Sequence, residues 1–186
     1  MTTVRWPAIA LIALAAACGK DKSKAQPKPH AHRAPNGGAL AAPTEEDIAT
    51  APRVPVGAFT VPVPSGWKDV SAEKARPEQV GLQTTVRQPP VLLIVSPAPD
   101  PMPFDPSNPS ACAENGGKMP GLVGTPGVID LPNGKACVLE TDDHGRMTMY
   151  VIVNPNGKGV MAQCQFEKPG DHGACDAIIR AIAPKS

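Results

Sequence analysis

Residues 127–166 read GVIDLPNGKACVLETDDHGRMTMYVIVNPNGKGVMAQCQF, and this stretch decides the fold class. Three turn signals divide it: Pro132-Asn133-Gly134, Asp142-Asp143-His144-Gly145 and Asn154-Pro155-Asn156-Gly157. Turns that end in glycine supply the positive φ that tight hairpins require. The intervening sequence predicts four strands, at residues 127–131, 135–141, 146–153 and 158–166. Because the connections between them are short, we expect an antiparallel meander.

Side-chain alternation along the last two strands predicts which residues share a face of the sheet. One face of the third strand carries Met147, Met149, Val151 and Val153. One face of the fourth strand carries Val160, Ala162, Cys164 and Phe166, and the other carries Gln163 and Gln165. The methionines are expected to fill the core, although thioethers can also line an adaptable binding surface.

A C-terminal helix follows the meander. Pro169-Gly170 breaks the last strand, Asp171 is a candidate N-cap, and the helix is predicted to run to about Ala183 before Pro184 ends it. An apolar stripe with helical spacing then packs on the sheet; it consists of Cys175, Ile178, Ile179 and Ile182. The predicted fold class is therefore α+β, an antiparallel meander sheet with a C-terminal helix on one face.

The first half of the domain is less regular. Residues 59–63 predict a strand that leads through a Pro-Ser-Gly turn to a core residue, Trp67, and the uninterrupted apolar run at residues 91–96 predicts a buried strand. Residues 97–109 are rich in proline and are expected to be irregular. Residues 110–119 predict a short helix.

The N-terminus has the pattern of an export signal. Arg5 precedes an uncharged run of ten residues, 8–17, which would rise about 15 Å as a helix, half of the ~30 Å hydrocarbon core. A short apolar segment after a basic start is typical of a signal peptide, here residues 1–17. Leu14-Ala15-Ala16-Ala17-Cys18 resembles the bacterial lipoprotein signal, in which the cysteine is lipidated. Ala15-Ala16-Ala17 also fits ordinary secretion, which is the alternative.

The cysteine count favours lipidation of Cys18. The chain has five cysteines, so one would be left over in an exported protein with only disulfides. Without Cys18, four remain for two bridges in an oxidising compartment. Cys164 and Cys175 both point into the predicted strand–helix interface and form one expected pair. Cys112–Cys137 is the other.

Residues 18–52 are predicted to be a lipid-anchored, disordered linker rich in proline and lysine. They contain almost no large apolar side chains, so they cannot offset the entropy cost of ordering. Glu45-Glu46-Asp47 could begin a short helical turn. The folded α+β domain is expected at residues 53–186. Gly19 follows the anchor, where an aspartate would indicate inner-membrane retention, so the outer membrane is the expected location.

Charge and composition exclude a nucleic-acid partner. The formal net charge is +1 and only 3% of residues are aromatic, whereas nucleic-acid binders carry a concentrated basic excess and stacking surfaces. The folded domain has 12 Lys and Arg against 13 Asp and Glu, and so is almost neutral.

The order of elements and two local motifs resemble the PsbP-like α/β fold, which occurs in photosystem II extrinsic subunits and in many small bacterial lipoproteins. The motifs are Val63-Pro64-Ser65-Gly66-Trp67 and Gly159 to Cys164 followed by a helix. The resemblance covers residues 59–182 and implies a PsbP-like sandwich with protein-binding or assembly roles. It carries over no catalytic residue.

No motif predicts a catalytic, metal or cofactor site. His30, His32, His144 and His172 lack the spacing of zinc ligands. Ser65 and Ser96 lie outside any G-x-S-x-G turn, and Asp142-Asp143-His144 is predicted to be a hairpin turn. We therefore expect a non-catalytic envelope lipoprotein that binds another envelope protein or a small ligand. The alternative is an envelope hydrolase that uses His144 with Asp142 or Asp143.

Overall fold

The computed structural model describes residues 39–86, 88–142, 145–154 and 156–185. The elements before the meander are α1 (Glu45–Thr50), β1 (Arg53–Val56), β2 (Phe59–Pro62), β3 (Trp67–Asp69), α2 (Ser71–Lys74), β4 (Val80–Thr84), β5 (Leu92–Pro97) and α3 (Pro109–Gly116). The later elements are β6 (Leu122–Leu131), β7 (Gly134–Asp142), β8 (Arg146–Val153), β9 (Gly159–Phe166), the 3-10 turn η1 (Pro169–Asp171), α4 (His172–Arg180) and β10 (Ala183–Pro184).

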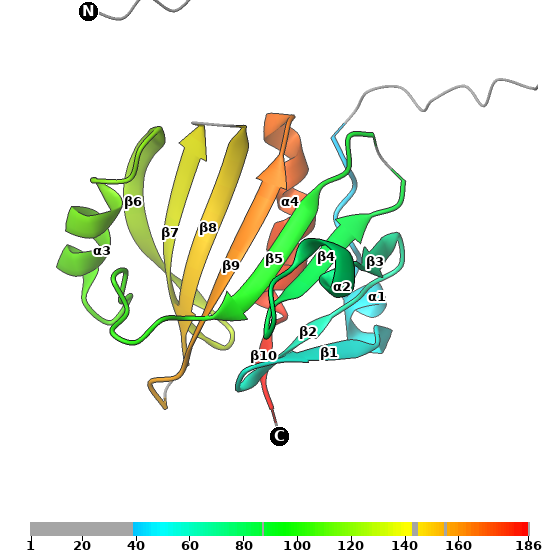
Figure 1. Cartoon of the computed structure of the whole chain (residues 1–186), viewed down its shortest axis with the longest axis horizontal. Helices are drawn as coiled ribbons and strands as arrows, with labels where there is room; N and C mark the ends of the chain where they lie inside the picture. The colour runs from blue at the N-terminus through cyan, green and yellow to red at the C-terminus, as the bar shows by residue number, and fades with distance from the viewer. Residues whose placement is uncertain (1–38, 87, 143–144, 155, 186) are drawn as a thin grey trace, which may run out of the picture. The chain divides into compact units, whose positions relative to one another are not determined.

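Two antiparallel sheets form the domain. The larger has seven strands in the order β3-β4-β5-β9-β8-β7-β6, and the smaller has three in the order β1-β2-β10 (Figure 1). Strands β6 to β9 pair consecutively, so the predicted meander is confirmed. The pairing of β5 with β9 joins the meander to the first half of the chain. The fold class is α+β, with α4 packed on the large sheet.

Glycine in the first meander turn is required by its surroundings. Gly134 has φ +144°, and a Cβ there would overlap the carbonyl oxygen of Val153 on the neighbouring strand. The Asn-Gly signal in the sequence therefore marks both a positive φ and a close backbone approach.

One face of the large sheet is fully covered. Alternate side chains from its strands pack there against α4 and the small sheet. The largest side chains in this core are under 2% exposed, and they include Leu82, Leu93, Ile152, Ile178, Ile179, Ile182 and Phe59. A disulfide between Cys164 of β9 and Cys175 of α4 ties the helix to the sheet. We call this side the covered face.

The other face, which we call the open face, has only partial cover. The short helix α3 lies over β6 and β7 and is joined to β7 by the disulfide Cys112–Cys137. A smaller apolar cluster lies beneath it, built on these two cysteines with Leu139, Met149 and Val151. In Figure 1 the open face is turned to the viewer, and strands β8, β9 and β5 carry no helix over their middle parts.

Side chains and backbone groups from distant segments contact both ends of α4, and Asp171 does not make the cap bond expected at its start. Asp171 is the N-cap residue but makes no side-chain cap bond; its Oδ1 accepts a hydrogen bond from the N–H of Leu40 at 2.9 Å. At the other end, Arg53 Nη2 donates to the carbonyl oxygen of Ala181 at 2.5 Å, and Asn133 Nδ2 donates to that of Ile182. Distant side chains thus bind carbonyls that a helix end leaves unpaired.

The sequence predicts that the folded domain starts at Arg53, but the structured part of the chain begins earlier. Helix α1 has a capping box in which the side chains of Thr44 and Asp47 bond to each other's backbone N–H. Leu40 and Ile48 pack against the main core. Partial burial of these two apolar side chains gives residues 40–50 a tertiary contact that composition alone did not reveal.

Several elements were not expected from the sequence. Strands β1, β3, β4 and β10 are short, so their alternation patterns are too brief to recognise. Strand β6 starts at Leu122, five residues before the predicted start, and contains Pro126. A break in register between Val123 and Gly127 accommodates this proline, and β6 lies at the edge of the sheet, where proline is tolerated.

Candidate functional site

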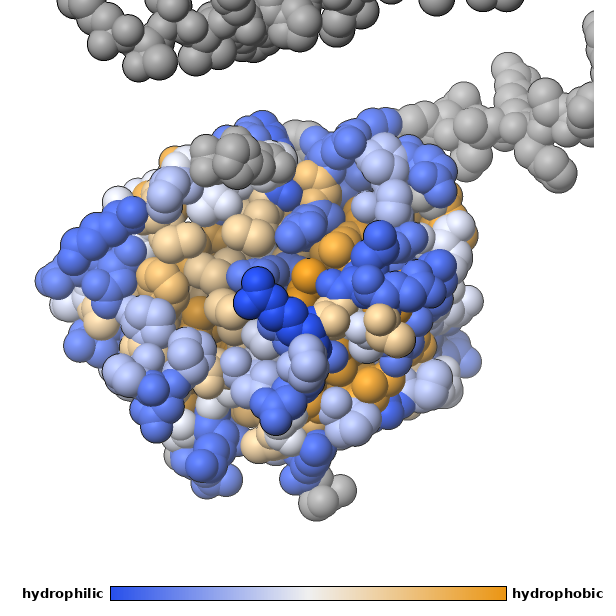
Figure 2. Space-filling model, viewed as in Figure 1, coloured by the Kyte–Doolittle hydropathy of each residue, from blue (hydrophilic) through white to orange (hydrophobic). Residues whose placement is uncertain are grey.

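A groove of about 700 Å³ crosses the open face of the large sheet. Figure 2 shows apolar side chains on this face with polar surface on both sides of them. The groove is lined by Lys74, Gln83, Pro89, Pro90, Leu92, Met119, Pro120, Thr141, Gly145, Arg146, Met147, Gln165, Phe166 and Glu167.

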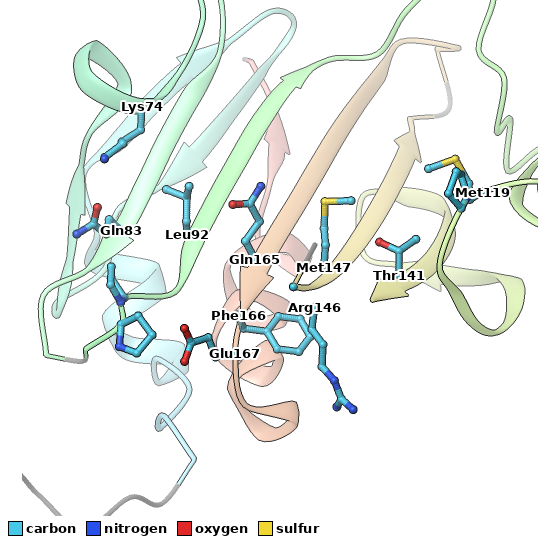
Figure 3. A pocket seen from close by; sticks show the side chains of 14 residues that line it. Lys74, Gln83, Leu92, Met119, Thr141, Arg146, Met147, Gln165, Phe166 and Glu167 are labelled. Carbon is cyan, nitrogen blue, oxygen red and sulfur yellow. The ribbon is translucent and has the colours of Figure 1, made fainter. Parts of the chain in front are cut away.

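The floor of the groove is a single row of cross-strand neighbours. In register across β4, β5, β9, β8 and β7, the row consists of Gln83, Leu92, Gln165, Met147 and Thr141. Figure 3 shows these side chains side by side, with Lys74 near Gln83 at one end and Met119 beyond Thr141 at the other. Five strands at about 4.8 Å spacing make a floor about 19 Å across.

Charged side chains stand at the margin of the groove. Lys74 comes from the end of α2, Arg146 begins β8, and Glu167 follows β9. Arg146 Nε lies 3.4 Å from Asp142 Oδ2, and both side chains are partly exposed. Such an exposed pair contributes little to stability. The margin therefore offers charges of both signs, and the floor offers amide donors and acceptors between apolar patches.

Beside the groove floor, Gln163 lies among methionine sulfurs. Its Nε2 is 3.8 Å from Met149 Sδ and 3.9 Å from Met161 Sδ. Both methionines belong to the smaller apolar cluster under α3. Thioether sulfur is a weak hydrogen-bond acceptor, so these contacts satisfy the amide poorly.

The covered face holds a polar cluster of its own, at α4. Tyr150 Oη donates a hydrogen bond to Asp176 Oδ1, and His172 Nε2 lies 3.9 Å from Asp176 Oδ2. Burial, followed by the contact with Asp176, raises the pKa of Tyr150 above its ordinary value of 10.0. Because Tyr150 is only 7% exposed, this cluster serves packing between β8 and α4.

The residues that the sequence analysis considered as sites differ in where the structure places them. Cys18, His30, His32, Asp143 and His144 lie outside the described residues. Asp142 is paired with Arg146. His172 begins α4, and the centroid of its ring lies 5.8 Å from that of Phe166, with the two rings tilted by 41°.

The four remaining cysteines form the two pairs expected from the sequence, Cys164–Cys175 and Cys112–Cys137, with Cα separations of 6.1 and 5.8 Å. Within the described residues, no three His, Cys, Asp or Glu side chains gather to hold a metal. No helix in the same part of the chain is long and apolar enough to span a membrane.

The groove itself was not predicted. Lys74, Gln83 and Glu167 carry no motif, and β4 was not recognised as a strand. One signal was present: Gln163 and Gln165 alternate with Ala162 and Cys164, which placed polar side chains on the face opposite the core. Finding the groove required knowing that β5 pairs with β9, because that pairing sets Leu92 opposite Gln165.

Comparison with known proteins shows little similarity. No family model matches the chain, and the curated proteins include no match. Among solved structures, cyanobacterial PsbP (CyanoP) from Synechocystis sp. PCC 6803 aligns with a TM-score of 0.46 and 15% identity, over 78% of this chain and 99% of that protein. A protein from Bacteroides thetaiotaomicron VPI-5482 aligns with a TM-score of 0.45 and 8% identity, over 69% of this chain. This chain spans about half (46%) of that second protein.

Proposed function

We propose that this protein is an exported lipoprotein, anchored to the cell envelope through Cys18, whose domain binds another envelope protein or a small ligand in the open-face groove. The observation that carries the binding role is the row of side chains from Gln83 to Thr141. Because α4 and the small sheet cover only the other face, four residues of this row stay partly or fully exposed, and only Thr141 at its end is buried. Grooves with apolar walls and a few convergent polar groups are the usual form of a binding site.

The chemistry of the groove suits an extended, mostly neutral occupant. Gln83 and Gln165 each offer an amide that can both donate and accept hydrogen bonds. Leu92 and Met147 together supply apolar contact, and the Met147 side chain can adapt its shape because it is flexible. A peptide segment or a small ligand with amide groups and apolar substituents would satisfy both kinds of side chain.

Substitution of Cys18 tests the lipid-anchoring part of the proposal. Replacing Cys18→Ser removes the lipid acceptor, so the protein should move from the membrane fraction to the soluble fraction of the envelope. Sucrose-gradient fractionation of the wild type should then place it with the outer membrane. A C18S variant that stays as membrane-bound as the wild type would contradict lipid anchoring.

Site-specific photo-crosslinking tests the groove in the full-length protein. A photoreactive amino acid at Gln165, on the groove floor, should give one discrete cross-linked product in intact cells. The matched control is the same group at Arg180, which is exposed on α4 of the covered side. Equal cross-linking from both positions would contradict a specific partner in the groove.

A small ligand would give a different result. It would leave no protein cross-link, but native mass spectrometry of the purified protein would show added mass. The substitution Leu92→Trp should remove that mass by filling the groove floor. Absence of both a cross-link and a bound mass would overturn the binding proposal.

The alternative, an envelope hydrolase, is favoured by one observation. Thr141, Gly145 and Arg146, which flank the Asp142–His144 turn in sequence, line the groove. Assays of wild type and His144→Ala on esterase, phosphatase and glycosidase substrates separate the two. Activity that H144A abolishes would support the hydrolase, and activity that H144A retains would exclude this site.

A further inference from the structure

All methionines after the initiator lie on one side of the domain. They are Met102, Met119, Met147, Met149 and Met161. Four pack in or against the cluster under α3, and Met147 lines the adjoining groove. The larger core on the covered face contains none of them. Such one-sided placement is not required for packing, since leucine and isoleucine fill the covered face.

Two of the thioethers already enclose a common point. Met149 on β8 lies directly opposite Gln163 on β9, and Met161 lies two residues before Gln163 on the same face. The Gln163 amide nitrogen is 3.8 and 3.9 Å from their sulfurs. In the described part of the chain these sulfurs are the only hydrogen-bond partners of that amide. The position between the sulfurs is thus held by a weakly bound group.

A third thioether lies farther along the same face of β9, on the side of Met161 away from Gln163. A Cβ on Gly159 would stand 2.6 Å from Met102 Sδ, so the Met102 side chain lies over this glycine. Gly159 precedes Met161 by two residues and therefore shares its face of β9. Met102 and Met161 pack against the same cluster and are both half-buried. Their partial exposure gives an ion access to the sulfurs.

The thioether sulfur donors determine which kind of metal ion could bind. Thioether sulfur is soft and uncharged, so it selects Cu(I) over harder cations. A monovalent ion also suits a neutral donor set, because it brings less charge into a half-buried place. Three flexible bonds in each methionine allow the sulfurs to close around an ion. Gln163 would turn away to a surface that is open to water.

We propose that Met102, Met149 and Met161 form a binding site for one soft monovalent cation, Cu(I), for which Ag(I) is a chemical analogue. The site is separate from the groove floor and does not depend on the binding function proposed above. It requires no redox step, since the ion enters and leaves as Cu(I).

Competition with a chromophoric Cu(I) chelator under anaerobic conditions tests the site in the full-length protein. The wild type should bind one Cu(I). The double variant Met149→Leu and Met161→Leu conserves volume and should remain folded, as circular dichroism would check. The affinity of this variant for Cu(I) should fall at least about tenfold. Even the loss of a residue that only positions a metal ligand typically lowers metal affinity by about 10–100-fold. Met147→Leu is the matched control on the same strand and should keep the wild-type affinity.

NMR of the protein labelled with ¹³C at the methionine methyl groups locates the ion directly. One equivalent of Ag(I) should shift the signals of Met102, Met149 and Met161 and leave those of Met147 and Met119 nearly unmoved. The His30→Ala, His32→Ala variant should bind normally. Binding that survives M149L/M161L, binding that is lost in the histidine variant instead, or no shift at the three methyl groups would overturn the proposal.

Discussion

The two faces of the large sheet are built from alternate residues of the same strands, yet they differ in how they are covered. On β9, Ala162 and Cys164 are buried under α4, whereas Gln163 and Gln165 point to the open face. On β8, Tyr150 and Ile152 face the main core, and Met147 faces the groove. The covering elements come from opposite ends of the domain: β1 and β2 before the sheet, α4 after it.

The comparison shows that burial depends on the covering segment as well as on the strand. The covered face receives a nine-residue amphipathic helix and a three-stranded sheet. The open face receives α3, which has eight residues and buries only Cys112 and Gly116. Stability should therefore be concentrated on one face and binding on the other. The following substitutions test this division, beginning with the largest expected effect.

Ile178→Ala should cause the largest loss of stability. Ile178 is fully buried between α4 and the sheet, and truncation leaves a cavity that costs about 2–5 kcal/mol in free energy of unfolding. Leu92→Ala is the control on the open face, where the side chain is half-buried, and should cost about 1 kcal/mol. Urea denaturation measures both. Equal losses in free energy of unfolding would contradict the expectation that stability is concentrated on the covered face.

Removal of each disulfide in turn compares how much each one contributes to stability, Cys164–Cys175 at α4 and Cys112–Cys137 at α3. The bridges close segments with sequence separations of 11 and 25 residues. Chain entropy alone predicts a cost of about 3 kcal/mol for either pair of Cys→Ala substitutions, slightly more for Cys112–Cys137 because its loop is longer. Denaturation under non-reducing conditions measures the two costs. A much greater loss for Cys164–Cys175 would show that it also orders the packing of α4.

Tyr150 should make stability depend on pH above 10. Below its ordinary pKa of 10.0, the phenol is protonated in both folded and unfolded chains and has no effect. Above it, only the unfolded chain loses the proton, because burial and Asp176 raise the pKa of the folded phenol. The free energy of unfolding should fall with a slope that approaches about 1.4 kcal/mol per pH unit in this range.

Tyr150→Phe should remove this part of the alkaline loss, and Tyr150 is the single tyrosine of the chain. Phenolate absorbance therefore reports on it directly and should rise only as the protein unfolds. A normal titration near pH 10 in the folded state would contradict the buried contact.

Asn133→Ala should have a smaller effect, at the C-terminal end of α4. Its amide donates to the Ile182 carbonyl, and the loss of this hydrogen bond should cost about 1 kcal/mol. Asn156→Ala, in the exposed turn between β8 and β9, is the control and should change stability less. Thermal unfolding compares the two variants. Equal midpoints would show that Arg53 alone suffices to cap the helix.

Gln165→Ala should have the smallest effect on folding and a clear effect on binding. Its side chain is exposed on the groove floor, so the free energy of unfolding should change by less than about 0.5 kcal/mol. Affinity for the groove occupant, measured on the cross-linked partner or the bound small molecule, should decrease. Unchanged affinity would remove Gln165 from the site.

Much of the fold could be predicted from local patterns. Asn-Gly and Asp-containing turns placed the hairpins of the meander, and alternation placed Cys164 toward the helix. The stripe from Cys175 to Ile182 placed α4 and its disulfide with β9. These features depend on neighbouring residues, whose spacing directly reflects the geometry of strands and helices. The site could not be predicted in this way, because its residues have no motif.

The sequence by itself determined the hairpin order, the two faces of the last two meander strands and the Cys164–Cys175 pair, because each of these follows from side-chain periodicity and chain reversal. Cys112–Cys137 was predicted only as the pair that remained. Only the tertiary structure decided that Asp171 binds the N–H of Leu40 instead of capping α4. It alone set Gln83, Leu92, Gln165, Met147 and Thr141 in one row. The physical reason is that pairing β5 with β9 joins segments about 70 residues apart, and loop closure over such a length leaves no local signature.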